Sequence, residues 1–155
     1  MIIWQVRGNT VTEFFDRHRP MLDAALDALR QRAFWSPFPE IPSGKIYGES
    51  AREEGETGFA ALRNAGFELP GHPNQRRLGA EVSPFGGALG ITYPAADAAT
   101  LIAAAQAAQP ALAAASPEAR VGACLEALVR LNRISFLIGH ATMHTTGQAF
   151  AMAFQ

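Results

Sequence analysis

Cys124 is the single cysteine of this 155-residue chain and therefore its only thiol nucleophile. A cysteine attacks carbonyl carbon as the thiolate, which requires a base or positive charge that lowers its pKa. Cys124, however, falls between Val121 and Leu128 at helical spacing, on the apolar stripe of a predicted helix. A thiol buried on such a face is inert, so we expect Cys124 to be structural and not catalytic.

His140 and His144 lie four residues apart, so on a helix they share one face, as two metal ligands would. The residues between them lack the glutamate of the metalloprotease helix pattern, and no third ligand stands nearby. We therefore interpret them as hydrogen-bonded structural histidines, with a metal-binding helical protein as an alternative. His18 and His72 stand alone in the sequence and carry little signal.

Gly86, Gly87 and Gly90 lie between two strand-like segments. They lack the spacing of a phosphate-binding loop and its following lysine, so we interpret them as hairpin glycines. Lys45 is the only lysine, and its neighbours do not predict the desolvation that a Schiff-base lysine requires. With no serine-nucleophile elbow and no paired carboxylates, the sequence predicts no catalytic, cofactor-binding or metal-binding residue in this chain.

The elements that position these residues are mainly helical in the first half of the chain. Residues 1–6 suit a short strand, and Thr10 with Glu13 forms a capping box that predicts a following helix. Pro20 predicts a kink or a restart of that helix. The next turns then present one apolar face at helical spacing, made of Leu22, Ala25, Leu26 and Leu29.

Two further segments precede a predicted boundary. The prolines and large rings of residues 34–39 predict an ordered loop that packs on another surface. Residues 50–64 suit a short helix weakened by Gly55 and Gly58. Turn residues are concentrated in 67–77. We therefore predict an N-terminal helical arm of residues 1–77, followed by a second domain of which residues 78–155 are the first part.

The second part of the chain is predicted to contain a β-hairpin followed by helices. Residues 78–82 and 89–93 are the expected strands. Asp97 caps an alanine-rich helix that runs to about residue 108 and is broken by Pro110. Ser116 caps the next helix, and a bend near Asn132 leads to a last helix over residues 134–146, with an interruption at Gly139 and an end at Gly147.

Composition excludes several classes of function. With 13 basic and 14 acidic residues the net charge is −1, which gives no electrostatic basis for binding nucleic acid or an anionic membrane. No secretory signal and no sustained run of bulky apolar residues is present, so we expect a soluble, cytoplasmic protein.

The last residues, 140–155, end in an apolar pattern without a glycine or charged cap. We expect a small-and-aromatic surface that requires a partner, made of Ala149, Phe150, Met152, Ala153 and Phe154. The chain is therefore interpreted as the front part of a larger protein. Its partner is either the remainder of the same fold or a second copy of the chain.

Several specific strings resemble the aldehyde dehydrogenase superfamily, and in particular the PaaN proteins of bacterial phenylacetic acid degradation. They occupy residues 14–20, 34–39, 81–86, 89–94 and 143–155. The helix start at residues 117–120 is similar to one in the wider superfamily. Residues 145–148 read Thr-Thr-Gly-Gln where ordinary members have a Glu-Thr-Gly-Lys-like turn, a departure that looks typical of PaaN.

This resemblance implies a mainly α fold with one small antiparallel β-hairpin, forming the N-terminal part of the larger α/β aldehyde dehydrogenase fold. It implies NAD- or NADP-dependent oxidation of a ring-opened, CoA-linked aldehyde by a cysteine thiolate, with a glutamate as base. In the family those residues and the cofactor loop lie downstream of Gln155. We therefore expect no catalytic activity and no bound cofactor in this chain alone, and we keep a stand-alone, non-catalytic helical interaction module as the alternative.

Overall fold

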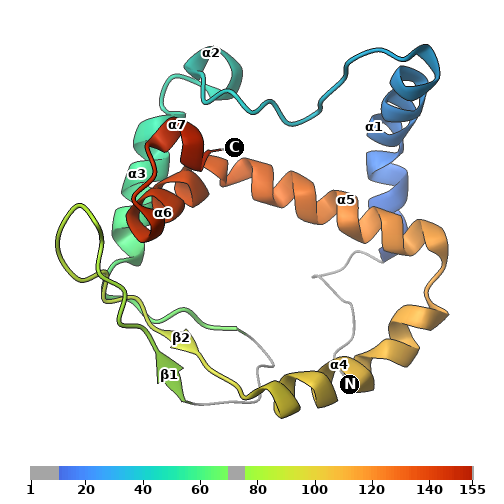
Figure 1. Cartoon of the computed structure of the whole chain (residues 1–155). Coiled ribbons are helices and arrows are strands. Elements are labelled where there is room, and N and C mark those ends of the chain that lie inside the picture. Colours follow the sequence, from blue (N-terminus) through green and yellow to red (C-terminus); the bar gives the residue numbers. More distant parts are fainter. Residues whose placement is uncertain (1–10, 70–75, 155) are drawn as a thin grey trace. The chain divides into compact units, whose positions relative to one another are not determined.

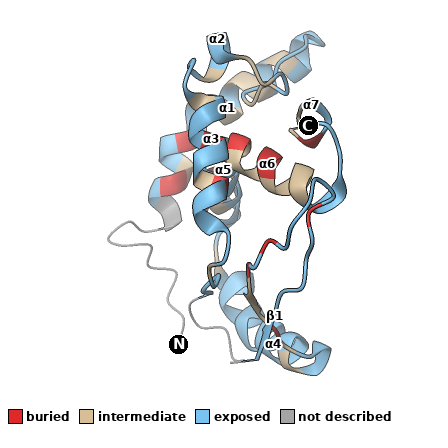
Figure 2. Ribbon diagram, turned by 90° about the vertical axis from the view of Figure 1, so that its left-hand side faces the viewer, coloured by how far each residue is buried: buried red, intermediate tan, exposed pale blue. Residues whose placement is uncertain are grey.

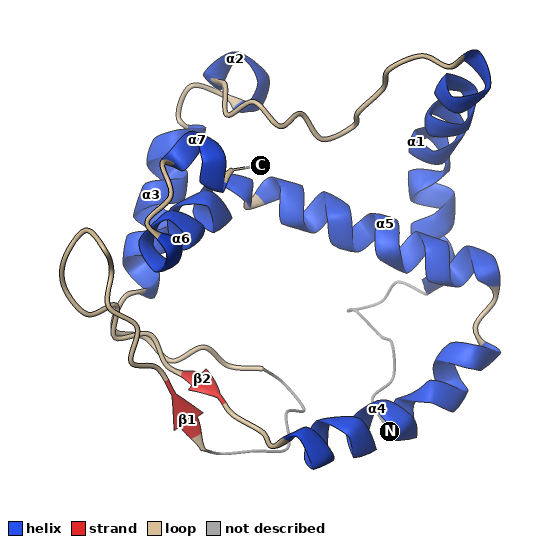
Figure 3. Cartoon of the chain, in the orientation of Figure 1, coloured by secondary structure: helices blue, strands red, loops and turns tan. Residues whose placement is uncertain are grey.

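The computed structural model describes residues 11–69 and 76–154, which form two compact units. The described part of the chain is mostly helical, with one small antiparallel sheet, as predicted (Figures 1 and 3). The predicted strand over residues 1–6, the Thr10 cap and His72 lie outside the described residues. No helix in the described ranges combines the length and the apolarity needed to cross a bilayer.

The first unit contains α1 (Val11–Gln31), most of α4 (Ala98–Ala114) and nearly all of α5 (Pro117–Arg133). The face of α1 that carries Phe14 is buried, and α5 buries Ala119 and Gly122. The two helices lie in direct contact, because a Cβ added at Gly122 would stand 2.4 Å from the backbone nitrogen of Phe15 (Figure 1). A glycine is therefore needed at this crossing.

Neither proline ends its helix, so the predicted break at Pro110 is wrong and Pro20 does not begin a separate helix. α1 continues through Pro20, and α4 continues through Pro110 as far as Ala114. A proline leaves the carbonyl four residues earlier without its helical partner. Asp16 and Gln106, which carry those carbonyls, are both exposed, so water can supply the missing hydrogen bonds.

Several apolar side chains of the first unit are exposed, contrary to the predicted packing. Leu26 and Leu29 on the expected apolar face of α1 are 39% and 75% exposed. Phe34, in the loop predicted to pack on a surface, is 95% exposed. The residues of α4 are nearly all exposed as well (Figure 2).

In the second unit, α3 (Ala51–Leu62) packs along α6 (Ser135–Thr146), with α2 (Gly44–Tyr47) and α7 (Phe150–Ala153) at their ends. Gly55 makes the close approach possible, because a Cβ there would lie 2.4 Å from the Cβ of Phe136. The predicted weak point of α3 is therefore its closest packing contact. The core consists of Phe59, Leu89 and Ile91, with Tyr93, Leu137 and Ala141 against it.

The hairpin is present, with shorter strands than predicted. β1 (Arg77–Leu78) pairs antiparallel with β2 (Tyr93–Pro94), and a separate bridge joins Val82 to Ala88. The positive φ angles of Gly79 and Gly90 interrupt the ladder between them. Since β1 spans residues 77 and 78, the predicted domain boundary falls inside the second unit, and it remains a prediction.

Three predicted caps are confirmed. Asp97 accepts a hydrogen bond from the Thr100 amide, which is the main reason that its pKa is lowered. Ser116 accepts one from the Ala119 amide at 3.1 Å, and Gly147 ends α6 in the left-handed conformation. α6 is not interrupted at Gly139, and the rings of Phe150 and Phe154 lie beside this glycine.

The prediction of an open aromatic surface over residues 149–154 is largely wrong. Ala153 is 6% exposed, and the rings of Phe150 and Phe154 pack against Phe136 at centroid distances of 5.8 and 4.8 Å. Met152 remains 63% exposed. The segment folds back on α6, where its rings pack against Phe136 and beside Gly139, which has no side chain.

Candidate functional site

Cys124 lies exposed on α5, so the predicted burial of its thiol is wrong. The buried face of α5 is formed by Ala119, Gly122 and Glu126, which points away from the bulky apolar stripe read from the sequence. Leu128, on that predicted stripe, is 46% exposed. The helix is therefore rotated relative to the sequence-based expectation, because α1 approaches through the small residues of α5.

His140 is 4% exposed and lies beside the Phe150 ring at a centroid distance of 4.7 Å. Burial lowers its pKa, which favours the neutral imidazole. Its ring donates a hydrogen bond to the Arg52 carbonyl, while Nε2 has no partner.

His144 joins the hairpin loop to α6. Its Nδ1 lies 2.9 Å from the Ser83 hydroxyl, and its ring stacks on Phe59 at 4.8 Å. The same hydroxyl accepts a hydrogen bond from the Phe85 amide. His144 is thus hydrogen-bonded, as predicted.

The two histidines are not brought together with further ligands. Across the described residues, no group of three or more histidine, cysteine, aspartate or glutamate side chains is placed to hold a metal ion. Lys45 lies exposed in α2, where its amide is capped by Ser43. Gly86 and Gly87 have positive φ in the hairpin loop, the role predicted for them.

A buried charge cluster in the first unit was missed from the sequence. His18 Nε2 donates to Glu126 Oε2 at 2.6 Å, and Arg130 Nε donates to Oε1 at 2.8 Å. Arg17 lies 3.5 Å from the same carboxylate. The hydrogen bonds from His18 and then Arg130 lower the pKa of the Glu126 carboxyl to about 2, although burial opposes the shift.

This cluster fastens α1 to α5. Glu126 is 7% exposed, and its carboxylate is engaged by Arg17, His18 and Arg130, so it is not free to bind a substrate. The sequence shows that Phe14 and His18 are four residues apart and that Gly122 and Glu126 are also four residues apart, so each pair shares one helix face. Nothing in the sequence showed that these two helices, 108 residues apart, form a pair.

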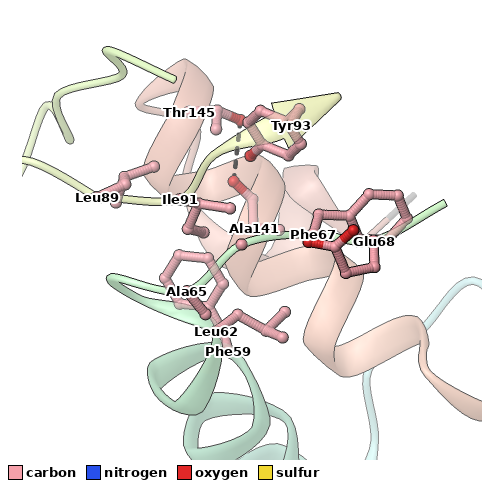
Figure 4. Close-up of a pocket in the computed structure, with 11 residues that line it drawn as sticks. Phe59, Leu62, Ala65, Phe67, Glu68, Leu89, Ile91, Tyr93, Ala141 and Thr145 are labelled. Atoms are coloured by element: carbon pink, nitrogen blue, oxygen red, sulfur yellow. Dashed lines mark hydrogen bonds between the residues drawn. The ribbon is translucent and has the colours of Figure 1, made fainter. Parts of the chain in front are cut away.

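An apolar pocket of about 330 Å³ opens in the second unit. Figure 4 shows side chains from α3, from the strand segment and from α6 that point into it, among them Phe59, Ile91, Tyr93 and Ala141. Glu68 lines the pocket but bonds Arg77 at 2.9 Å, and the Thr145 hydroxyl donates to the Ala141 carbonyl.

The hairpin loop and the apolar pocket do not fit a dinucleotide. The glycines of the hairpin loop form a turn and not a phosphate-binding loop. The pocket is lined mainly by apolar side chains, and its polar groups on Glu68 and Thr145 already form hydrogen bonds within the chain. A cofactor site requires a few polar groups placed for recognition. No redox step is therefore assigned to residues of this chain.

With this geometry defined, the fold can be placed among known proteins. No protein-family model matches the chain, and no curated protein matches it. Among solved structures, it matches the crystal structure of an NAD-dependent aldehyde dehydrogenase from Burkholderia multivorans with a TM-score of 0.82 and 49% sequence identity. The match covers 92% of this chain and 25% of that chain.

The chain therefore has the fold of a portion of an aldehyde dehydrogenase. The likeness supports the aldehyde dehydrogenase superfamily that the sequence strings suggested. The particular protein that it resembles is the Burkholderia enzyme, and this chain spans a quarter of that enzyme's length.

Proposed function

We propose that this chain is a structural part of an NAD-dependent aldehyde dehydrogenase and that the residues of the redox reaction lie outside its 155 residues. The observation that supports this most is the 49% identity to such an enzyme over 92% of the chain, together with coverage of only 25% of the enzyme.

In this proposal, the chain has a structural role in the enzyme. The α3–α6 pair and the hairpin form a core in the second unit, and the Glu126 cluster fastens α1 to α5 in the first. Catalytic groups act from rigid elements that hold them within a fraction of an ångström. In this proposal, the described helices support such elements without taking part in the chemistry.

The finer part of the proposal is the substrate class. The strings at residues 81–86, 89–94 and 143–155 favour the phenylacetate branch, in which the substrate is a ring-opened, CoA-linked aldehyde. The Thr-Thr-Gly-Gln turn at residues 145–148 also favours this branch over ordinary aldehyde dehydrogenases. The proposed enzyme acts in the cytoplasm with NAD or NADP.

The test is an assay of the polypeptide encoded by the entire reading frame that contains this chain. We expect NAD or NADP reduction with aldehydes, and a kcat/KM at least about tenfold higher for the CoA-linked aldehyde than for a simple alkyl aldehyde. Equal kcat/KM values for both aldehydes would remove the phenylacetate assignment. No cofactor reduction with any aldehyde would remove the dehydrogenase assignment itself.

A further inference from the structure

The apolar pocket of the second unit is placed directly over the core of that unit. Phe59, Leu89 and Ile91 are 3%, 1% and 8% exposed and form both the core and the pocket floor. Leu62 and Phe67 line the same pocket and are 42% and 52% exposed (Figure 4). Within the described residues of this unit, the core is therefore continuous with an open apolar surface.

The polar groups of the pocket argue against a small polar ligand. Glu68 is held by Arg77 at 2.9 Å, and the Thr145 hydroxyl donates to the Ala141 carbonyl at 2.9 Å. A small-molecule site is apolar with several polar groups that orient the ligand. Apolar side chains of a protein, in contrast, need shape and apolar contact alone.

The comparison indicates which protein supplies those side chains. The matched dehydrogenase has three quarters of its length outside the match. Elements of one fold pack against each other around a shared core, so we expect part of that remainder to pack against the matched quarter. Within the second unit, the pocket joins that unit's core, as expected for a surface that becomes interior.

We propose that this pocket is the seat on which apolar side chains from the remainder of the aldehyde dehydrogenase chain pack, so that it becomes part of the enzyme's interior. This inference rests on the proposed function. It names the pocket around Leu62 and Phe67 as the contact that links this chain to the remainder.

The test compares two substitutions that introduce the same charge. Leu62→Asp places a carboxylate at the pocket, whereas Ile46→Asp places one on α2 of the same unit, away from the pocket. The two positions are similarly exposed, at 42% and 49%. Each variant is made in the 155-residue chain and in the polypeptide of the entire reading frame, and thermal unfolding is measured for all.

In the 155-residue chain we expect the two variants to melt within about 2 °C of each other, because both charges remain hydrated. In the longer polypeptide we expect Leu62→Asp to melt at least about 3 °C below Ile46→Asp, because its charge is buried without a partner. Equal melting of the two variants there would overturn the inference.

A dye that fluoresces on apolar surfaces, 8-anilinonaphthalene-1-sulfonate, gives a second measurement. We expect it to bind the 155-residue chain, to bind Leu62→Asp less, and to bind the longer polypeptide little. Saturable NAD binding to the 155-residue chain that Leu62→Asp abolishes would overturn the inference in favour of a ligand site.

The two proposals fail separately. A longer polypeptide that reduces NAD with aldehydes, while both variants melt alike, contradicts only the inference that the remainder of the chain packs on the pocket. A longer polypeptide without this activity contradicts the proposed function, whatever the variants show. A reading frame that ends after Gln155 contradicts both.

Discussion

The Glu126 carboxylate of α5 accepts a hydrogen bond of 2.6 Å from His18 of α1, a residue 108 positions earlier in the chain. Both side chains are buried, and Arg130 Nε donates a hydrogen bond of 2.8 Å to the second oxygen of the carboxylate. This pair connects two helices that are distant in sequence, and the hydrogen bond from His18 is the main reason that the pKa of the Glu126 carboxyl is lowered to about 2.

Replacing the carboxylate should weaken the contact between α1 and α5. We expect Glu126→Gln to lower the free energy of unfolding at pH 7 by about 1–3 kcal/mol, because the amide has no negative charge and replaces one of the two acceptor oxygens with an NH2 group that cannot accept. Urea denaturation followed by circular dichroism measures this change. Asp27→Asn is the matched control, because it breaks the exposed Asp27–Arg30 pair, which is worth about 0–1 kcal/mol. An equal loss in both variants would refute the special role of the buried cluster.

The same carboxylate predicts an acid dependence. The Glu126 pKa is about 2 in the folded chain and has an ordinary value of 4.5, so its stabilising contribution is present above about pH 4.5. It is lost as the pH falls from 4.5 towards 2, because the unfolded chain then binds a proton that the folded chain does not. We expect the difference in unfolding free energy between the wild-type chain and Glu126→Gln to shrink over this range, as denaturation at several pH values will show.

The glycines of α3 make a steric prediction. At Gly55 a Cβ would lie 2.4 Å from Phe136 Cβ, whereas at Gly58 the nearest atom is the flexible Leu137 Cδ1 at 3.1 Å. Alanine favours a helix over glycine by about 1 kcal/mol. We therefore expect Gly55→Ala to destabilise by about 2 kcal/mol or more through overpacking and Gly58→Ala to be nearly neutral.

Urea denaturation of the two glycine variants measures these free energies directly. Equal stabilities would show that α3 and α6 are not in the close contact described.

Ser83 fixes the hairpin loop on α6. Ser83→Ala removes the 2.9 Å contact with His144 Nδ1 and the hydrogen bond from the Phe85 amide, so we expect a loss of about 1–2 kcal/mol. Ser36→Ala removes an exposed hydroxyl that donates to the Phe38 carbonyl and should cost a few tenths of a kcal/mol. Chemical denaturation compares the two, and a larger loss for Ser36→Ala would be incompatible with this role.

Much of the local structure could be predicted from the sequence, because caps and turns depend on neighbouring residues. Asp97, Ser116 and Gly147 act where the sequence placed them, and the glycines of the hairpin turn the chain as expected. These predictions rest on hydrogen bonds between residues only a few positions apart.

The pairing of distant elements could not be predicted. Cys124 was expected inside and lies outside, because the position of α1 and not the leucine pattern decides which face of α5 is buried. Pro20 was expected to kink or restart its helix and Pro110 to break one, but both helices continue through the proline, since the carbonyls left without a helical partner are on exposed residues. Glu126 had no visible role, since its partner His18 is a neighbour only in the folded chain.

The proposed function, which places the redox residues outside this chain, leads to a prediction about the exposed Cys124. In the polypeptide of the entire reading frame, we expect Cys124→Ala to leave kcat/KM for an aldehyde within about twofold of the wild-type value, since removal of a catalytic nucleophile costs orders of magnitude. Steady-state kinetics decide this. A loss of several orders of magnitude would place the nucleophile in this chain.

The central claim is that this chain has the fold of part of an aldehyde dehydrogenase without its redox residues. The most direct measurement is the rate of NADH formation by the purified 155-residue chain with NAD and an aldehyde, beside the polypeptide of the entire reading frame. We predict no rate above background for the 155-residue chain and steady turnover for the longer polypeptide. Aldehyde-dependent NADH formation by the 155-residue chain alone would contradict the claim.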